Sequence, residues 1–455
     1  MTVDYSEQSN QQELTNPRTP LHRRIAENLS NRINGGELKP GNKLPSERQI
    51  AHQFNASRAT VRTALQHLEQ EGLITRRDRR SAIVTLRRDI QPNLRIACTS
   101  PRLKEVLRLL GEKQLMPPRC QLQLLDIRRE RAISELVTQP ASGADILLCD
   151  LEYANCMMGQ EEMFTPFPAS VVSDSDMPMA LRESFVSGGF YKAVPLGVSP
   201  MVLYYNKAMV NEVGVSIPQG PWHWDQLADI ARRFVGNKFG FQIRPKYSHY
   251  AALVAGFGGE LYRADGKVGV NESDGFCAAF RFIEDLITSK AVAPVGYDHI
   301  DLFAEKRCGM AMEGYDKYNE YRKALGEDLG IAILPGAKPA AAVVDGFVLM
   351  VMKGMENLQP VEDMLRTLML ANTQTIMVQE GVALPICREV LSATRLHDAG
   401  LSNEAVNVFT AETGSVKPAN RPESIAYGQS VEKVIQEMHL GLLQIDELCG
   451  QFKSM

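Results

Sequence analysis

The first part of the chain alternates apolar and polar positions with the period of an α-helix. An apolar residue recurs at every fourth position until Gly35 and Gly36, which predicts a helix over residues 21–34 (Leu21, Ile25, Leu29 and Ile33). Ser46 precedes Gln49 by three residues, the spacing of a capping box, so a second helix is expected from Glu47 to about Phe54.

A third helix and two strands follow. Ser57 can cap the helix, whose apolar positions form one stripe (Val61, Ala64, Leu65 and Leu68). Residues 55–57 leave only a short turn between the second and third helices, which is the arrangement of a helix-turn-helix. Residues 73–77 and 82–86 are expected to form the two strands of a wing, joined by residues 78–81. The pattern therefore predicts an α+β winged helix-turn-helix.

From Asn93 onward, short apolar runs alternate with amphipathic stretches, and this order predicts a parallel α/β sheet. The runs lie at 94–97, 122–125 and 146–149, and the helical stretches at 103–110 and 133–137. Ligands of open α/β sheets bind beyond the carboxyl ends of the strands. Thr99, Ser100 and residues 150–153 are therefore expected to face a cleft, with loop capping as the alternative.

Length and composition set the domain plan. With 455 residues the chain is longer than a single hydrophobic core usually supports, so we expect more than one domain. The expected parts are a polar tail over residues 1–17, a head over 18–90 and a body over 93–455. The tail has no apolar stretch, and the longest apolar run, Ala340 to Met352, contains Asp345 and is too short to span a bilayer. These features predict a cytoplasmic protein without a membrane partner.

The charge is distributed unevenly. Residues 18–90 contain fifteen lysine and arginine residues against seven acidic residues, whereas the chain as a whole has a net charge of −4. A basic head before an acidic body is typical of nucleic-acid binding. Residues near the start of the second helix of a helix-turn-helix meet base edges, which here are Arg58, Thr60 and Arg62. Arg79 and Arg80 at the wing tip would lie beside the DNA backbone or minor groove.

The segment from Leu38 to Ile74 resembles the GntR family of bacterial transcription regulators. The shared pattern is L-x-P-G-x-x-L-P-S-E-R-x-I-A-x-x-F-x-x-S-R-x-T-V-R-x-A-L-x-x-L-x-x-E-G-L-I. The resemblance implies a dimer on operator DNA, with contacts from Arg48, Ser57, Arg58, Thr60 and Arg62. The chain departs from the family at residues 78–81, where the wing lacks the usual glycine.

Five phrases follow in order along the rest of the chain: Ala193–Gly197 with Leu203–Lys207, Gly220–Leu227, Gly258–Glu260, Phe303–Tyr315 and Gly381–Pro385. Taken together they resemble the type II periplasmic binding proteins, in particular the family 1 carbohydrate receptors of transporters. The resemblance implies two α/β lobes, over about 93–198 plus 346–400 and about 202–342, with C-terminal helices over 401–455. It places hinges near 198–201 and 342–346, around a bound ligand.

By the same resemblance, eight residues fall where the family contacts its sugar: Asp150, Glu152, Ser199, Tyr247, Tyr250, Tyr315, Asp345 and Tyr427. Carboxylates accept hydroxyl hydrogens and aromatic faces cover the apolar side of a pyranose, so the residue types suit a carbohydrate. Any of the tyrosines could instead belong to the core, and Glu313 could be a helix cap.

The sequence offers no pattern for a metal, a cofactor or catalysis. The eight cysteines include no C-x-x-C pair, the eight histidines are dispersed, and no hydrolase motif is recognisable. The alternative is a GntR-type regulator with an aminotransferase-like body that holds pyridoxal phosphate, but its lysine, aspartate and arginine cannot be placed in order. A transport receptor is a third reading, which the basic head disfavours.

The preferred hypothesis is a regulator of carbohydrate uptake or utilisation genes that is not an enzyme. A saccharide between the lobes would change the operator affinity of a homodimer, and we expect it to release the DNA.

Overall fold

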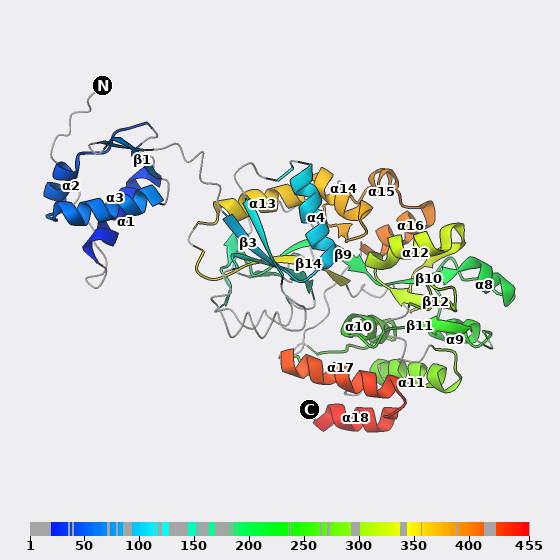
Figure 1. The fold of residues 1–455 in the computed structure, drawn as a ribbon. Helices are drawn as coiled ribbons and strands as arrows, with labels where there is room; N and C mark the ends of the chain where they lie inside the picture. The colour runs from blue at the N-terminus through cyan, green and yellow to red at the C-terminus, as the bar shows by residue number, and fades with distance from the viewer. Residues whose placement is uncertain are drawn as a thin grey trace. The chain divides into compact units, whose positions relative to one another are not determined.

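The computed structural model describes residues 20–34, 37–38, 41–70, 73–78, 81–84, 93–113, 115–116, 121–126, 144–151, 154, 163–168, 182, 185–187, 189–234, 236, 238–263, 266–270, 274–292, 301–336, 344–355, 357–387, 390–413 and 425–454. The chain divides into two compact units, Met1–Pro92 and Asn93–Met455 (Figure 1). We call them the head and the body and describe each by itself.

The head is a winged helix-turn-helix. Its elements are α1 (Leu21–Asn34), α2 (Glu47–Gln53), α3 (Arg58–Gln70), β1 (Ile74–Asp78) and the antiparallel β2 (Ser81–Val84). The predicted capping box starts α2, because Ser46 N donates to Gln49 Oε1 at 2.8 Å and Gln49 N donates to Ser46 Oγ at 3.4 Å. One apolar cluster joins the three helices and both strands, so the wing is anchored to the helices.

The first lobe of the body is built on a six-stranded sheet of order β15-β9-β14-β5-β3-β4. Its strands are β3 (Asn93–Cys98), β4 (Gln121–Asp126), β5 (Ile146–Asp150), β9 (Val194–Pro200), β14 (Val344–Val351) and β15 (Leu384–Pro385). β3 pairs in parallel with β4 and β5, as predicted, whereas β14 runs antiparallel to β5 and β9. The whole sheet is mixed, because β9 runs towards the second lobe and β14 returns from it.

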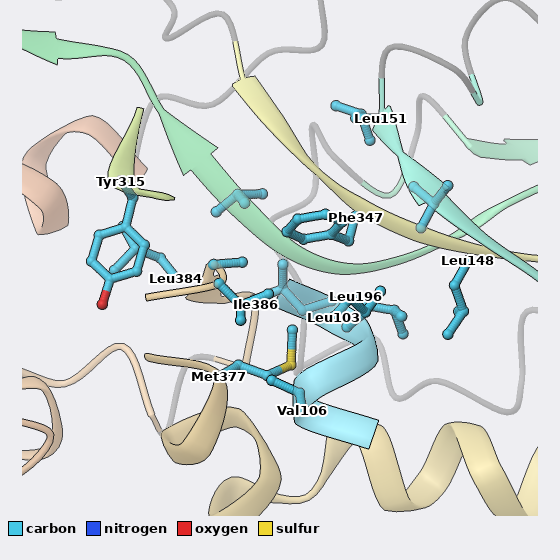
Figure 2. Close-up of a cluster of buried hydrophobic side chains, with 14 of the residues drawn as sticks. Leu103, Val106, Leu148, Leu151, Leu196, Tyr315, Phe347, Met377, Leu384 and Ile386 are labelled. Carbon is cyan, nitrogen blue, oxygen red and sulfur yellow. The ribbon is translucent and has the colours of Figure 1, made fainter. Parts of the chain in front are cut away.

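Helices and a small sheet complete the first lobe. They are α4 (Pro101–Glu112), α13 (Gln359–Met369), α14 (Ala371–Gln379), α15 (Ala393–Asp398), α16 (Asn403–Thr413), and the strands β6 (Phe167–Pro168), β7 (Val186–Ser187) and β8 (Phe190–Tyr191). α4 provides the crossover that the parallel pair β3 and β4 requires. Figure 2 shows Leu103 and Val106 of α4 and Met377 of α14 beneath the sheet residues Leu196 and Phe347.

The second lobe contains the sheet β11-β12-β10-β13. Its elements are β10 (Val202–Asn206), α8 (Lys207–Glu212), α9 (Trp224–Ala231), β11 (Phe239–Gln242), α10 (Tyr247–Gly256), α11 (Asp274–Thr288), β12 (Cys308–Glu313), the 3-10 turns η5 (Tyr315–Lys317) and η6 (Gly326–Asp328), α12 (Tyr318–Leu325) and β13 (Leu329–Ala332). Alternate residues of β10 enter opposite faces: Val202 and Tyr204 join the cluster shared with the first lobe, and Leu203 and Tyr205 join a second cluster. This alternation is the two-residue period of a strand buried on both sides.

The C-terminal helices are divided between the lobes. α16 contributes Ala405 and Phe409 to the cluster that the first lobe shares with one face of the second-lobe sheet. α17 (Ile425–His439) and α18 (Ile445–Ser454) add Ile435 and Leu448 to the cluster of the second lobe. The chain therefore passes between the lobes at Met201, between β13 and β14, and between α16 and α17. Whether these passages act as hinges stays a prediction.

Candidate functional site

The arginines predicted to contact DNA lie on the outer surface of the head. The inner stripe of α3 is at most 2% exposed (Val61, Ala64, Leu65 and Leu68). Arg58 and Arg62, four positions apart on α3, are exposed, and so is Arg48 on α2. Three guanidinium groups are therefore accessible, as contact with guanine or phosphate requires. Arg79 and Arg80 lie outside the described residues.

Three of the predicted DNA contacts, Ser57, Thr60 and Arg62, also form contacts within the helix-turn-helix. Ser57 Oγ accepts the N–H of Thr60 at 3.1 Å and lies 2.8 Å from the Thr60 hydroxyl, which caps the N-terminus of α3. Arg62 Nη2 lies 3.2 Å from Glu47 Oε2 on α2. The side chain of Arg62 is 60% exposed, so this ion pair contributes at most about 1 kcal/mol.

Three predicted ligand contacts gather at one edge of the first-lobe sheet. Ser199 near the end of β9 is the register partner of Asp345 on β14, and Asp150 at the end of β5 is the partner of Phe347 on β14. Direct partners share a face of the sheet, as do residues two apart on a strand, so the three side chains lie on one face. The two aspartates are half-buried. Glu152 lies outside the described residues.

The end of β3 reaches the same edge. Ser100 Oγ accepts the N–H of Leu103 at 3.3 Å and caps α4, which is the loop-cap alternative. Thr99 is 7% exposed, and its hydroxyl oxygen is buried without a hydrogen-bond partner in the described part of the chain. A buried hydroxyl of this kind costs about 1–3 kcal/mol, which a partner from a ligand would offset.

The second lobe carries a buried ionic network at the end of its sheet. Glu313 is the last residue of β12, and its carboxylate binds Arg244 Nε and lies 3.1 Å from His249 Nε2. Arg244 Nη2 also donates to Asp301 Oδ2 at 3.0 Å, and Tyr321 donates to the same oxygen at 3.0 Å. Glu313 therefore anchors the network and does not cap a helix.

Opposite charges determine the protonation of this network. Burial alone would raise the pKa of Glu313, but His249 and Arg244 outweigh burial and lower the pKa well below its usual range. Burial lowers the pKa of Arg244, but Glu313 and Asp301 outweigh that effect and raise it. Glu313 and Arg244 are therefore both charged at neutral pH.

Side chains link the lobes close to Met201. Ser199 Oγ accepts the N–H of Asp316 at 3.2 Å and lies 3.3 Å from its carboxylate. Arg102 on α4 lies 3.4 Å from Asp316 and 3.8 Å from Glu320. A Cβ on Gly314 would lie 2.5 Å from Ser199 Oγ, so any other residue here would displace the Ser199 side chain.

The structure places two predicted ligand contacts in the core, the alternative that the sequence left open for the tyrosines. Tyr250 is 0% exposed, and its hydroxyl contacts His439 inside the second lobe. Tyr315 is also 0% exposed and donates to the carbonyl of Val378 at 2.7 Å; Figure 2 shows its ring beside Leu384. Both hydroxyls are satisfied within the core, so neither tyrosine presents a face to a ligand in this conformation.

The other two predicted tyrosines, Tyr247 and Tyr427, belong to the apolar cluster of the second lobe. Tyr247 is 7% exposed and stacks on Tyr262 with 5.4 Å between ring centroids. Tyr427 on α17 is half-buried, and its hydroxyl accepts the N–H of Val268 at 3.1 Å. Their role in ligand binding stays a prediction.

The sequence patterns do not single out Arg244, Asp301, His249 or Arg102. Arg244 follows an apolar strand by two residues, a position that marks the carboxyl end of β11 and could have drawn attention to it. Asp301 carries no such signal, because it precedes β12 in a loop. Among the described residues, no group of three or more His, Cys, Asp or Glu side chains could hold a metal, and no helix is long and apolar enough to cross a membrane.

Comparison with family models identifies both parts of the chain. The model of the bacterial extracellular solute-binding protein family matches residues 130–399, more than half of the chain. The chain belongs to this family. The model of the bacterial regulatory proteins of the gntR family matches residues 21–84, so the head is a GntR domain. Both sequence resemblances are thereby confirmed, and the aminotransferase-like body finds no support.

Curated relatives match the head. The HTH-type transcriptional repressor NagR of Bacillus subtilis is 47% identical over 66 residues, which are 14% of this chain and 27% of NagR. The mannosyl-D-glycerate transport/metabolism system repressor MngR of Escherichia coli is 44% identical over 55 residues, which are 12% of this chain and 23% of MngR. The chain thus spans about a quarter of the length of these relatives.

Solved structures match the body. The GacH receptor of Streptomyces glaucescens, solved unliganded and with acarbose, superposes with a TM-score of 0.65 at 19% identity. The match covers 80% of this chain and 96% of the receptor. This likeness establishes the two-lobe solute-binding fold of the body.

Proposed function

We propose that the protein is a ligand-responsive transcription regulator that represses genes for carbohydrate uptake or utilisation. A saccharide bound between the two lobes of the body changes the affinity of the head for operator DNA. The observation that carries the proposal is the presence of a GntR head and a solute-binding body in one chain. The names of NagR and MngR support repression of such genes, and the acarbose complex of GacH supports a saccharide.

The edge of the first-lobe sheet supports a ligand rich in hydroxyl groups. Asp150 and Asp345 offer carboxylate oxygens, which accept hydroxyl hydrogens. Thr99 adds a buried hydroxyl that lacks a partner among the described residues. We propose Asp150, Ser199, Asp345 and Thr99 as contacts from the first lobe, with Glu152, Tyr247 and Tyr427 as further candidates.

The head is proposed to bind double-stranded DNA through Arg48, Arg58 and Arg62, with Ser57 and Thr60 at the start of α3 and Arg79 and Arg80 on the wing. Two half-sites one helical turn apart would be bound by a homodimer. We place the protein in the cytoplasm, where its DNA target lies. The role is binding and regulation rather than catalysis.

Ligand and operator are coupled only if the ligand binds the DNA-bound and free states unequally. Couplings of about 1 to 3 kcal/mol change the operator affinity by about fivefold to over a hundredfold. We propose that the saccharide weakens DNA binding, so that the presence of the sugar induces the genes.

The proposal is tested on the full chain in two steps. Thermal unfolding is recorded against a panel of monosaccharides, oligosaccharides and sugar alcohols, with pyridoxal phosphate included. A ligand at a hundredfold excess over its Kd stabilises the folded form by about 2.7 kcal/mol. DNA duplexes that the protein binds are then selected from a pool of random sequences. The Kd of the protein for a selected duplex is measured with and without the saccharide that raised the Tm.

Two variants separate the sites. Arg58→Ala should abolish the selection of DNA and leave the saccharide-induced shift in Tm intact. Asp345→Asn should remove that shift and leave DNA binding intact. A shift with pyridoxal phosphate alone, or a saccharide that binds without changing operator affinity, would contradict the proposal.

A further inference from the structure

Two thiols meet between helices of the second lobe. Cys277 Sγ, in the first turn of α11, lies 3.7 Å from Cys449 Sγ on α18. Both residues are half-buried, whereas the other cysteines of the described residues are buried (Cys98, Cys149, Cys308 and Cys387). Within the described part of the chain, this pair is therefore the place where two thiols are both adjacent and open to solvent.

Contacts at both ends of the helix pair keep the sulfur atoms together. Phe276, next to Cys277, packs edge-on against Phe452 of α18 with 6.0 Å between centroids, and Phe280 packs against the same ring at 6.2 Å. At the other end, Ile445 N donates to Glu284 on α11 at 3.0 Å. These contacts fix the antiparallel register of α11 and α18, so the proximity of the thiols is a property of the packing.

We propose that Cys277 and Cys449 form a reversible redox pair that a peroxide converts into a disulfide. One thiolate attacks hydrogen peroxide and becomes a sulfenic acid, releasing one water once protonated. The other sulfur then attacks the sulfenic sulfur, the S–S bond forms, and a second water leaves. Overall, two thiols and one peroxide give one disulfide and two waters, and each sulfur loses one electron.

The geometry needs little adjustment for this reaction. A disulfide has a sulfur separation of roughly 2.0 Å, so the two atoms must approach by less than the width of one atom. The crosslink would join α11 to α18 and close a loop that contains β12, β13 and β14. Oxidation therefore fastens the C-terminal helix to the second lobe, and a dithiol reductant reverses it by thiol exchange.

The experiment uses the purified full chain. The protein is treated with hydrogen peroxide, alkylated with iodoacetamide and digested without reduction, and the peptides are identified by mass spectrometry. We expect one pair of peptides joined through Cys277 and Cys449. Its mass should be lower than that of the two reduced peptides together by the mass of two hydrogen atoms, and dithiothreitol should separate it into the two peptides. The unfolding midpoint of the second lobe should rise by roughly 5 °C or more on oxidation, because long loops gain most from a crosslink.

Cys449→Ser should remove both the linked peptide and the rise in the unfolding midpoint. Cys277→Ser provides the same test from the other helix, should the first variant fail to fold. Iodoacetamide on both cysteines after peroxide treatment, separate sulfinic acids at each, or links to other cysteines would overturn the proposal. None of these outcomes affects the proposed regulatory function, which does not depend on these thiols.

Discussion

The substitution Glu313→Gln tests the ionic network at the end of β12. Glutamine keeps the size of the side chain but removes the charge that Arg244 and His249 face. Glu313 is 4% exposed and Arg244 is bound to it directly, so the variant leaves a half-buried guanidinium, 21% exposed, with Asp301 as its remaining described counter-charge. The loss should therefore far exceed that of a surface ion pair.

The expected magnitude follows from this burial. Removing one partner of a buried ion pair costs about 3–5 kcal/mol, because the other charge stays desolvated. Asp301, 3.0 Å from Arg244, retains part of the compensation, so we expect about 3 kcal/mol, near the lower end of that range. The pH dependence follows from the lowered pKa of Glu313. The contribution of Glu313 to the free energy of unfolding is complete above about pH 4.5 and is lost as the pH falls through the lower pKa of the folded state.

The assay uses the position of the tryptophans. The chain contains two, Trp222 and Trp224, and both are buried in the second lobe. Urea unfolding followed by tryptophan fluorescence therefore reports the second lobe of the intact protein. The matched control is Glu305→Gln, whose carboxylate is 49% exposed and 3.6 Å from Arg307, and it should cost less than about 0.5 kcal/mol. Equal midpoints for the two variants at pH 7 would refute the reasoning.

Two further substitutions give smaller, separable effects. Burial raises the pKa of Glu412 to about 7, so its contribution to stability is complete below about pH 4.5 and is lost as the pH rises through 7. Because glutamine has no charge to bury, Glu412→Gln should be more stable than the unchanged protein at pH 8, by up to about 3 kcal/mol. The exposed control Glu380→Gln should show no such rise in Tm. Ser57→Ala should cost the head about 1 kcal/mol and speed amide exchange at the start of α3, whereas Ser57→Asp, which preserves the cap, should not. Unchanged exchange in Ser57→Ala would contradict the capping role.

The head could be predicted in detail because its signals are local. The capping box at Ser46 and the stripe of α3 each depend on residues a few positions apart, and the structure shows both as predicted. Local sequence alone left two roles possible for Ser57, a helix cap and a contact with DNA. A residue type that caps a helix also suits a phosphate contact, and only the position of the hydroxyl shows that Ser57 serves as a cap.

The body could be predicted as a fold but only partly as a site. Strands β3, β4 and β5 follow from apolar runs, whereas Tyr250 lies on α10, a helix buried on almost all sides. Such a helix has no polar face, so its sequence cannot distinguish an inward tyrosine from one at the surface. The partners of Glu313 were missed for a different reason: Asp301 and His249 reach it from elements that only the tertiary fold brings together.

The connection between the head and the body constrains how the proposed regulation can work. The head ends at Pro92, and β3, whose far end carries Thr99, begins at the next residue. The first lobe is thus the part of the body to which the head is joined. Closure of the lobes on a ligand would move the second lobe relative to the first, and a head attached only to the first lobe would not sense that movement. Under the proposed function, closure would reach the DNA through the surface of the second lobe, and a second copy of the chain in the proposed homodimer would supply the partner for that surface.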